Sequence, residues 1–209
     1  MSELLAIHPQ NPQPHLINKA VNVIQAGGVI VYPTDSGYAL GCHLGDKTAL
    51  DRIRRIRRLE ENHHFTLVCR DLSEVSVYAR VDNRVFRILK TYTPGPYTFI
   101  LPATRDVPRR LQHPSRKTIG LRIPQHPVAL ALLDALEEPL MSTTLYLPDT
   151  DLAIIEPQAI NELLGGQIDL IIDSGFCGME PTSIIDLMDP IPKIIRKGKG
   201  DISPFLVKE

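Results

Sequence analysis

The chain has 209 residues, of which 43% are hydrophobic and 22% are charged, and its formal net charge at pH 7 is −1. This composition is that of a soluble globular protein, and the balanced charge alone favours no particular partner. No apolar run approaches the roughly 20 residues of a membrane span, so we expect no membrane-spanning helix. The length suits one domain, and we predict a single domain over residues 1–209 with its core at about 14–204.

The cysteines and the N-terminus indicate the compartment. Cys42, Cys69 and Cys177 are odd in number and far apart, with no C-x-x-C pair. This spacing argues against a disulfide framework and against a zinc site, and it fits a reducing environment. The first nine residues lack the basic start and long apolar core of a signal peptide. We therefore predict a cytoplasmic protein without a metal site of its own.

Helices and short strands interleave along the chain. The spacing of apolar residues, together with Gly and Pro at the ends of segments, predicts both kinds of element. Helices are expected at 14–26, 47–58, 72–78, 83–89, 127–136 and 157–164, with a helical turn at 107–111. Strands are expected at 4–7, 29–32, 65–69, 97–101, 118–124, 139–144, 168–173, 182–187 and 193–196. This order predicts an α/β domain around one twisted sheet, and the short links favour a mixed sheet.

Three of the predicted helices begin beside residues that favour an N-cap. Asp46 is the candidate cap of the helix that follows it, and the next two helices have either Asp71 or Ser73 and either Asp82 or Asn83. The side-chain oxygen of such a residue accepts a hydrogen bond from a free backbone N–H of the first turn.

A polar loop follows the strand at 29–32. Pro33 cannot donate to a sheet ladder, so the strand should end there. The loop then offers four polar side chains: Thr34, Asp35, Ser36 and Tyr38. Because loops that leave strand ends usually carry the ligand chemistry of α/β proteins, this loop is a candidate site.

Cations gather in a few segments although the total charge is balanced. Five arginines lie between residues 52 and 58, and further clusters are Arg109-Arg110, Arg116-Lys117 and the segment 196–199. Clustered cations predict a local anion-binding surface, and the alternative is a set of solvated helix and loop faces. No Walker A, G-x-G-x-x-G or G-x-S-x-G motif is present, so a nucleotide site would depend on dispersed arginines and hydroxyls, which suit phosphate.

Several segments together resemble one family. Residues 33–41, P-T-D-S-G-Y-A-L-G, resemble the P-T-D-T-x-Y-G-L-G signature of the YrdC/YciO family, the threonylcarbamoyl-AMP synthase superfamily, most closely its YciO branch. Residues 118–124, 182–186 and 196–198 resemble its T-x-G-x-R-x-P, S-T-x-x-D and R-x-G segments. The resemblance implies an α/β (α+β), YrdC/RibB-like fold with a twisted, mixed seven-stranded sheet, flanking helices and a concave basic face.

The resemblance also implies site residues. On the substrate side these are Thr34, Tyr38, Arg57, Thr182 and Ser183. On the nucleotide and phosphate side they are Arg55, Arg122, Ser142, Thr144 and Arg196. The family's K-x-R motif falls within residues 54–58, either as Arg55-Ile56-Arg57 or two residues later, and its register stays open. His63 and His64 are further candidates, with exposed loop histidines as the alternative.

The implied activity is that of an L-threonylcarbamoyl-AMP synthase-like nucleotidyltransferase. Such an enzyme uses ATP, bicarbonate and L-threonine with Mg²⁺, and its product serves the threonylcarbamoyladenosine modification of tRNA. The alternative is a protein of the same fold that binds double-stranded RNA or tRNA and has weak or lost synthase activity. Arginine in place of the motif's lysine and Thr144 in place of an asparagine favour the alternative, because neither replacement preserves the original hydrogen bonds.

Overall fold

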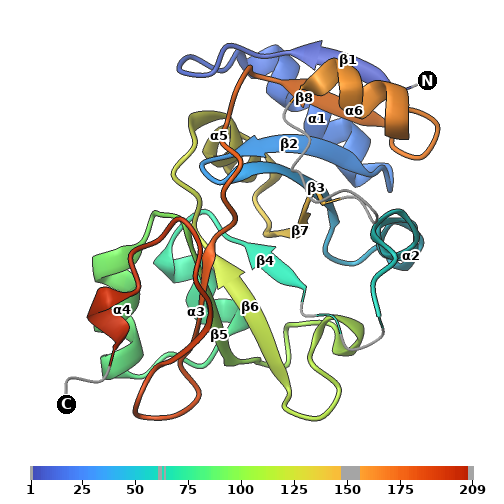
Figure 1. The fold of residues 1–209 in the computed structure, drawn as a ribbon. Coiled ribbons are helices and arrows are strands. Elements are labelled where there is room, and N and C mark those ends of the chain that lie inside the picture. Colours follow the sequence, from blue (N-terminus) through green and yellow to red (C-terminus); the bar gives the residue numbers. More distant parts are fainter. Residues whose placement is uncertain (1, 61–62, 64, 147–155, 207–209) are drawn as a thin grey trace.

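The computed structural model describes residues 2–60, 63, 65–146 and 156–206, and within these the chain forms one mixed sheet of ten strands with six α-helices (Figure 1). In space the strands follow the order β1-β8-β2-β3-β7-β4-β6-β5-β9-β10. Their bounds are β1 (Glu3–Ala6), β2 (Ile30–Thr34), β3 (Gly37–His43), β4 (Thr66–Val68), β5 (Tyr97–Pro102), β6 (Thr118–Arg122), β7 (Leu140–Thr144), β8 (Leu170–Asp173), β9 (Ser183–Asp186) and β10 (Lys193–Arg196). The helices are α1 (Pro14–Gln25), α2 (Lys47–Arg57), α3 (Leu72–Tyr78), α4 (Asn83–Tyr92), α5 (Pro127–Leu136) and α6 (Pro157–Leu164).

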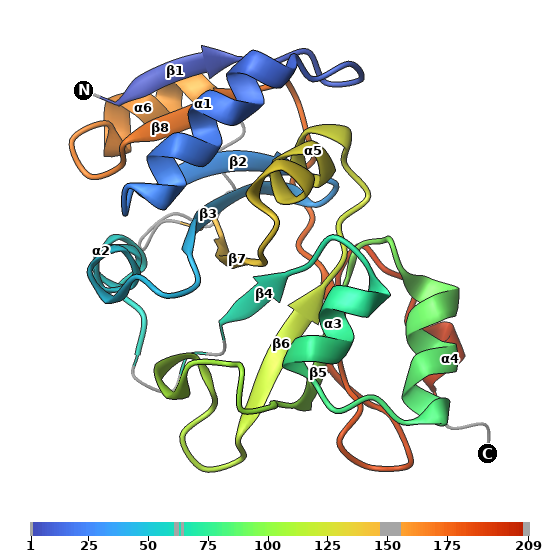
Figure 2. The same ribbon diagram turned by 180° about the vertical axis from the view of Figure 1, so that it is seen from behind.

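Helices cover both faces of the sheet around β2 and β8. α1 and α5 pack side by side on one face, and α6 lies against the opposite face (Figures 1 and 2). The side chains of the β2 segment alternate between these layers: Ile30 and Tyr32 pack under α1 and α5, whereas Val29 and Val31 join the core on the other side. Because a strand has a period of two and both faces are buried here, the segment is apolar throughout.

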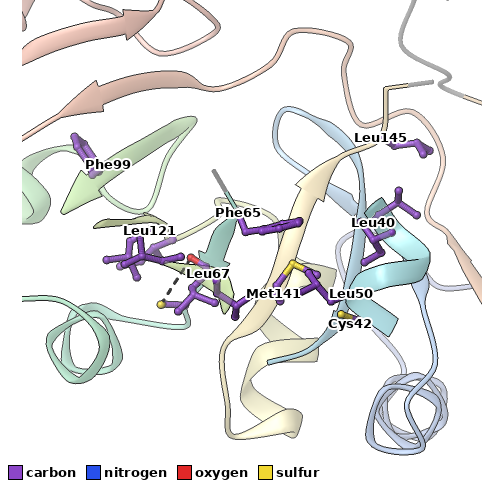
Figure 3. Packing of buried hydrophobic residues seen from close by; sticks show 14 of the residues in the cluster. Leu40, Cys42, Leu50, Phe65, Leu67, Phe99, Leu121, Met141 and Leu145 are labelled. Carbon is purple, nitrogen blue, oxygen red and sulfur yellow. Dashed lines mark hydrogen bonds between the residues drawn. The ribbon is translucent and has the colours of Figure 1, made fainter. Parts of the chain in front are cut away.

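The hydrophobic core continues through the middle of the sheet. Antiparallel pairing of β4 with β7 joins the two halves of the sheet. One half consists of β1, β8, β2, β3 and β7, and the other of β4, β6, β5, β9 and β10. Figure 3 shows Phe65 and Met141 between Leu40 and Leu50 on one side and Leu121 on the other, all within one buried cluster. The two halves therefore hold side chains from distant parts of the sequence in fixed relative positions.

The strand β3 was not predicted, and the expectation that β2 ends at Pro33 is wrong. β2 continues to Thr34 and forms an antiparallel hairpin with β3, in which Pro33 lies opposite Tyr38. A proline is accepted because β8, the other neighbour of β2, pairs only with Ile30 and Val31. Of the predicted loop at 34–38, only Asp35 and Ser36 form the hairpin turn, and the other residues belong to β2 and β3.

Glycine in β3 explains why the sequence conceals this strand. A Cβ atom at Gly41 would lie 2.6 Å from the side chain of Leu140 and 3.0 Å from the ring of Tyr32. The close approach of neighbouring side chains requires glycine, but glycine inside a run of residues normally indicates a loop.

The class of fold is confirmed, but the number of strands differs from the expected seven. The sheet is mixed and twisted and has helices on its faces, as predicted. The seven strands were implied by the family resemblance, whereas the sequence pattern already predicted the two edge strands, β1 and β10; the hairpin strand β3 is the one that it missed.

The predicted helices and their caps are confirmed. All six predicted α-helices form, and their ends differ from the predicted ones by at most a few residues. Asp46, Asp71 and Asp82 each accept a hydrogen bond from a backbone N–H of the first turn, at distances between 2.7 and 2.9 Å. Capping depends on local chain geometry alone, so it can be predicted from the sequence.

Candidate functional site

A cavity of about 430 Å³ lies where the β2–β3 hairpin, β7, β6 and the β9–β10 end of the sheet meet. Its volume is in the usual range for small-molecule sites. Eight of the ten predicted site residues line it: Thr34, Tyr38, Arg57, Arg122, Ser142, Thr144, Thr182 and Arg196. These side chains come from segments up to 162 residues apart in the sequence, and the fold brings them together around one cavity.

Arg122 lies at the end of β6 and is held by Asp35 in the turn between β2 and β3. A guanidinium Nη of Arg122 donates to the Asp35 carboxylate at 2.6 Å, and both side chains are at most 10% exposed. The same carboxylate oxygen accepts the backbone N–H of Gln125 at 3.1 Å. Arg122 is therefore not a solvated surface arginine, because its position is set by a buried ion pair.

Two buried polar atoms of this pair have no hydrogen-bond partner within the described residues. They are Oδ2 of Asp35 and Nε of Arg122, and Nδ1 of His126 nearby is a third such atom. Burial lowers the pKa of His126, while the charge of Asp35 opposes this shift. Buried polar atoms are normally hydrogen-bonded, so unpaired donor and acceptor atoms beside a pocket are consistent with positions for water or ligand atoms.

Arg196 reaches the cavity because of a bulge in β10. Ile194 pairs with Ile185, but Arg196 pairs with Ile184, so Ile195 is the extra residue of the bulge. Ile185 is buried in the core, whereas Ile184 lines the cavity. Without the bulge, Arg196 would follow Ile194 to the core side; the bulge moves it to the cavity side.

Arg57, at the last turn of α2, completes the group of three arginines. It donates a hydrogen bond to the backbone carbonyl of Tyr146, and its guanidinium lies 5.9 Å from the centre of that ring. Arg196 in turn donates to the carbonyl and to the hydroxyl of Thr182, at 3.0 and 3.1 Å. Both arginines are anchored through neutral groups, so these contacts leave their positive charges uncompensated.

The three charges influence one another. Burial lowers the pKa of Arg57, and the positive charge of Arg196 lowers it further, while Tyr146 has the opposite effect. Burial also lowers the pKa of Arg196, to which the charge of Arg122 contributes. A buried site with three cations and one carboxylate, that of Asp35, is stabilised by a bound anion.

Hydroxyl groups line the rest of the wall. Thr98 and Thr182 share a hydrogen bond of 3.0 Å, and Ser142 bonds the phenol of Tyr32 at 2.8 Å. The hydroxyl of Thr34 donates to the carbonyl of Gly37 at 2.6 Å, which closes the hairpin turn. These hydroxyls are held in fixed directions, as required of groups that orient ligand oxygens.

Tyr38 contributes its ring to the cavity, but its phenol serves the fold. The hydroxyl donates to the carbonyl of Gly175 at 2.8 Å, and burial raises its pKa well above the usual value. The contact ties the β2–β3 hairpin to the loop after β8. Tyr38 therefore remains neutral and acts as a wall.

Two predicted site residues do not line the cavity. Ser183 is fully buried behind it: its hydroxyl donates to Gly200 O at 2.5 Å and accepts from Gly198 N at 2.9 Å. Arg55 points elsewhere and lines a separate depression of about 260 Å³ beside Arg52. The cause is the geometry of a helix, because residues two apart, such as Arg55 and Arg57, lie on different faces.

Other residues of the cavity were missed or left open. Thr66 and Val68 of β4 and Thr98 of β5 face the cavity, and a polar residue within an apolar strand is the signal that could have found the threonines. His63, one of the two flagged histidines, lies in the cavity wall 3.4 Å from the hydroxyl of Thr143. His64 lies outside the described residues. Tyr146 follows β7 in an irregular segment, where no sequence pattern indicates a position.

The described residues contain no group of three or more His, Cys, Asp or Glu side chains that could hold a metal ion. Mg²⁺ usually keeps several waters and binds through one or two carboxylates together with substrate phosphates. The described lining of the cavity contains no carboxylate, and that of Asp35 is paired with Arg122, so a Mg²⁺ ion here would be held mainly by the phosphates of a ligand. No helix in the described part of the chain is long and apolar enough to cross a membrane.

A twisted mixed sheet with a cavity that three arginines and many hydroxyls line defines an α/β protein with a cationic pocket. A family model for Sua5, YciO and YrdC proteins, described as "Telomere recombination", matches residues 22–198. The chain belongs to this Sua5/YciO/YrdC family, as its signature segments predicted.

Relatives agree in sequence and in structure. YciO of Escherichia coli (strain K12) is 56% identical over 206 residues, which is 99% of this chain and 100% of that protein, and the E. coli YciO crystal structure has a TM-score of 0.95. A threonylcarbamoyl-AMP synthase of Hydrogenovibrio crunogenus is 30% identical over 65% of this chain and 74% of its own length. Sua5 of P. abyssi, crystallised with L-threonine, shares the fold at a TM-score of 0.86 and 24% identity, over 94% of this chain and 58% of that one. The family thus includes enzymes named threonylcarbamoyl-AMP synthase.

Proposed function

We propose that the chain is a threonylcarbamoyl-AMP synthase-like enzyme, which converts ATP, bicarbonate and L-threonine to threonylcarbamoyl-AMP and pyrophosphate. The observation that carries this proposal is the convergence of Arg57, Arg122 and Arg196 on one cavity with oriented hydroxyls. ATP and bicarbonate are anions and L-threonine carries a carboxylate, and the reaction joins parts of all three. Relatives named threonylcarbamoyl-AMP synthase, and a Sua5 structure with L-threonine, support the choice of substrates.

The reaction needs positioning rather than a protein nucleophile. The threonine amine combines with bicarbonate to form a carbamate, with loss of water. A carbamate oxygen then forms a bond to the α-phosphorus of ATP, the bond from this phosphorus to the bridging oxygen breaks, and pyrophosphate leaves. Both reacting groups are negatively charged, so the protein's contribution is to hold them together and to neutralise charge.

The cavity provides groups for each part. Arg122 and Arg196 are suited to the phosphates because each presents a planar fork of N–H donors, and Asp35 holds the first of them rigidly. We assign Arg57 and Thr182 to the carboxylate and hydroxyl of threonine, and Thr34 to the carbamate region. Mg²⁺ bound to the ATP phosphates would supply further charge neutralisation.

Two replacements set this chain apart from the synthase motifs. If the K-x-R motif corresponds to Arg55-Ile56-Arg57, its second cation, Arg57, lines the cavity, whereas Arg55, in the lysine position of that register, is directed elsewhere. Thr144 takes the place of an asparagine and offers one hydroxyl instead of an amide with two donors. We therefore expect ATP to bind more weakly here than in synthases with the complete motifs. The product would serve tRNA modification in the cytoplasm.

The test is pyrophosphate release by the purified protein with ATP, bicarbonate, L-threonine and Mg²⁺, with each substrate omitted in turn. We expect release only when all are present. Arg57→Gln should abolish it, and Arg87→Gln, which removes an exposed arginine of α4 outside the cavity, should not. No release in any mixture, together with tight RNA binding at low salt, would replace this proposal with the RNA-binding alternative.

A further inference from the structure

A second depression is lined by residues of the connection between β5 and β6. This connection lies at the end of the molecule away from α1 and α6 (Figures 1 and 2). The depression has a volume of about 570 Å³ and shares no lining residue with the arginine cavity. Its charged lining consists of four cations: Arg80, Arg105, Arg109 and Lys117. Thr104 and Gln112 add polar groups, so the surface suits a polar ligand.

The segment that carries most of these cations is rigid. Residues 103–117 form a long connection whose ends are joined by the hydrogen bond from Ala103 N to Lys117 O at 3.0 Å. Val107 and Leu111 fix it from below, since both are buried in the core. Gln112 closes it from within through a hydrogen bond of 2.8 Å to the carbonyl of Val107. Long connections with such internal packing are frequently functional.

The cations of this segment fall into two groups. Residues 103–117 include five cations and a single acid, Asp106, in a chain whose total charge is −1. Two of the five support the fold: Arg110 donates to Gly45 O, and Arg116 pairs with the buried Asp186 at 2.6 Å.

The other group faces the depression. It consists of Arg105, Arg109 and Lys117, and Arg80 joins them from the segment after α3. The side chains of the three arginines have no ion-pair or hydrogen-bond partner in the part of the chain that the structure describes. Lys117 donates only to the carbonyl of Pro114, at 2.7 Å, and thus keeps its charge uncompensated. The fold therefore concentrates positive charge on a rigid concave surface, where it attracts anions.

We propose that this depression is a second anion site, and that it binds a ligand with two or more neighbouring phosphate groups. Arginine forks match phosphate oxygens, and several cations on one open surface can contact successive phosphates of a chain. A single carboxylate would neutralise only one of them. Inorganic polyphosphate and a nucleic-acid backbone share this chemistry, and they are distinguished by experiment.

The test compares two doubly substituted proteins with the same change of charge. Arg105→Gln/Arg109→Gln alters the depression, and Arg87→Gln/Lys90→Gln removes two exposed cations of α4 outside it. The probes are tripolyphosphate and a short RNA duplex, whose dissociation constants are measured at several salt concentrations. All four positions are exposed, so both proteins should fold, and thermal denaturation verifies this.

We expect the depression variant to bind at least one probe roughly tenfold more weakly than the control variant, as the loss of charged hydrogen bonds requires. For the duplex, the slope of log affinity against log salt should fall by about 1.8, at roughly 0.9 per phosphate contact. Weakened RNA binding alone identifies a nucleic-acid backbone, and weakened tripolyphosphate binding alone identifies a compact polyphosphate. Equal affinities of the two variants for both probes would overturn the proposal. Pyrophosphate release from ATP should be the same in both variants, because the two sites are separate.

Discussion

The ion pair between Arg122 and Asp35 gives the sharpest prediction, because both side chains are at most 10% exposed. Asp35→Asn leaves a buried guanidinium without its counter-ion, and Arg122→Met leaves a buried carboxylate that keeps only the backbone N–H of Gln125. Breaking a buried pair on one side costs about 3–5 kcal/mol, since an unpaired charge stays in the interior. For a chain of this length that lowers Tm by roughly 6–20 °C, at about 2–4 °C per kcal/mol.

The double variant Asp35→Asn/Arg122→Met tests the cause. Removing both charges together leaves no buried ion, so it should recover most of the stability that each single change loses. Lys193→Met is the matched control, because it removes an exposed ion pair with Asp189 and should leave Tm unchanged.

The assays are thermal and urea denaturation followed by circular dichroism, and ATP binding by calorimetry. The folded double variant should bind ATP at least tenfold more weakly, which separates the role of Arg122 in binding from its role in stability. Single variants that lose less than about 1 kcal/mol would refute the buried pair. An unchanged dissociation constant for ATP in the double variant would remove Arg122 from the site.

Three further changes test other parts of the site. Thr34→Val removes the hydroxyl that donates to Gly37 and should lower the free energy of unfolding by about 1–3 kcal/mol. It should reduce threonine use more than ATP affinity, whereas Thr34→Ser should preserve both. Equal losses for the two substrates would show that the threonine region is misplaced. Burial lowers the pKa of His126 below its usual value of 6.5, so on acidification the unfolded chain binds a proton at this imidazole before the folded protein does. The stability of the folded protein should therefore fall as the pH drops below about 6.5, and His126→Gln should reduce the decrease in Tm between about pH 7 and pH 5. An unchanged decrease would contradict the effect of burial. Deletion of Ile195 should remove the bulge but leave Arg196 directly after Ile194 and opposite Ile184, so that Arg196 still faces the cavity and ATP affinity changes little; a loss of ATP binding as large as that of Arg196→Gln would contradict this account of the register.

Local features of the fold were predictable because their causes lie within a few residues. Asp46, Asp71 and Asp82 cap helices through backbone groups that are three residues away. The helix at 127–136 begins with Pro127, whose missing N–H costs nothing in a first turn, and its predicted bounds agree with α5. The apolar runs of most strands depend equally on short-range alternation.

The strand β3 shows where this reasoning ends. Gly37 and Gly41 indicate a loop when they are considered alone, and only the neighbouring Leu140, 99 residues beyond Gly41, explains why a strand there needs glycine. The expectation of a loop after Pro33 was wrong because it also depended on a distant segment. β8 pairs with β2 only at Ile30 and Val31, so no neighbouring strand needs a hydrogen bond from the backbone nitrogen of Pro33.

Local sequence patterns were enough to predict the helices and most of the strands, and the signature segments identified the family and most of the predicted residues that line the cavity. The tertiary structure alone decided which of these residues meet. Arg122 is paired with Asp35, 87 positions away, Arg196 faces the cavity because of one extra residue in β10, and Ser183 faces inward. The direction of a side chain depends on strand register and on contacts between distant segments, and neither leaves a signal in the local pattern of residues.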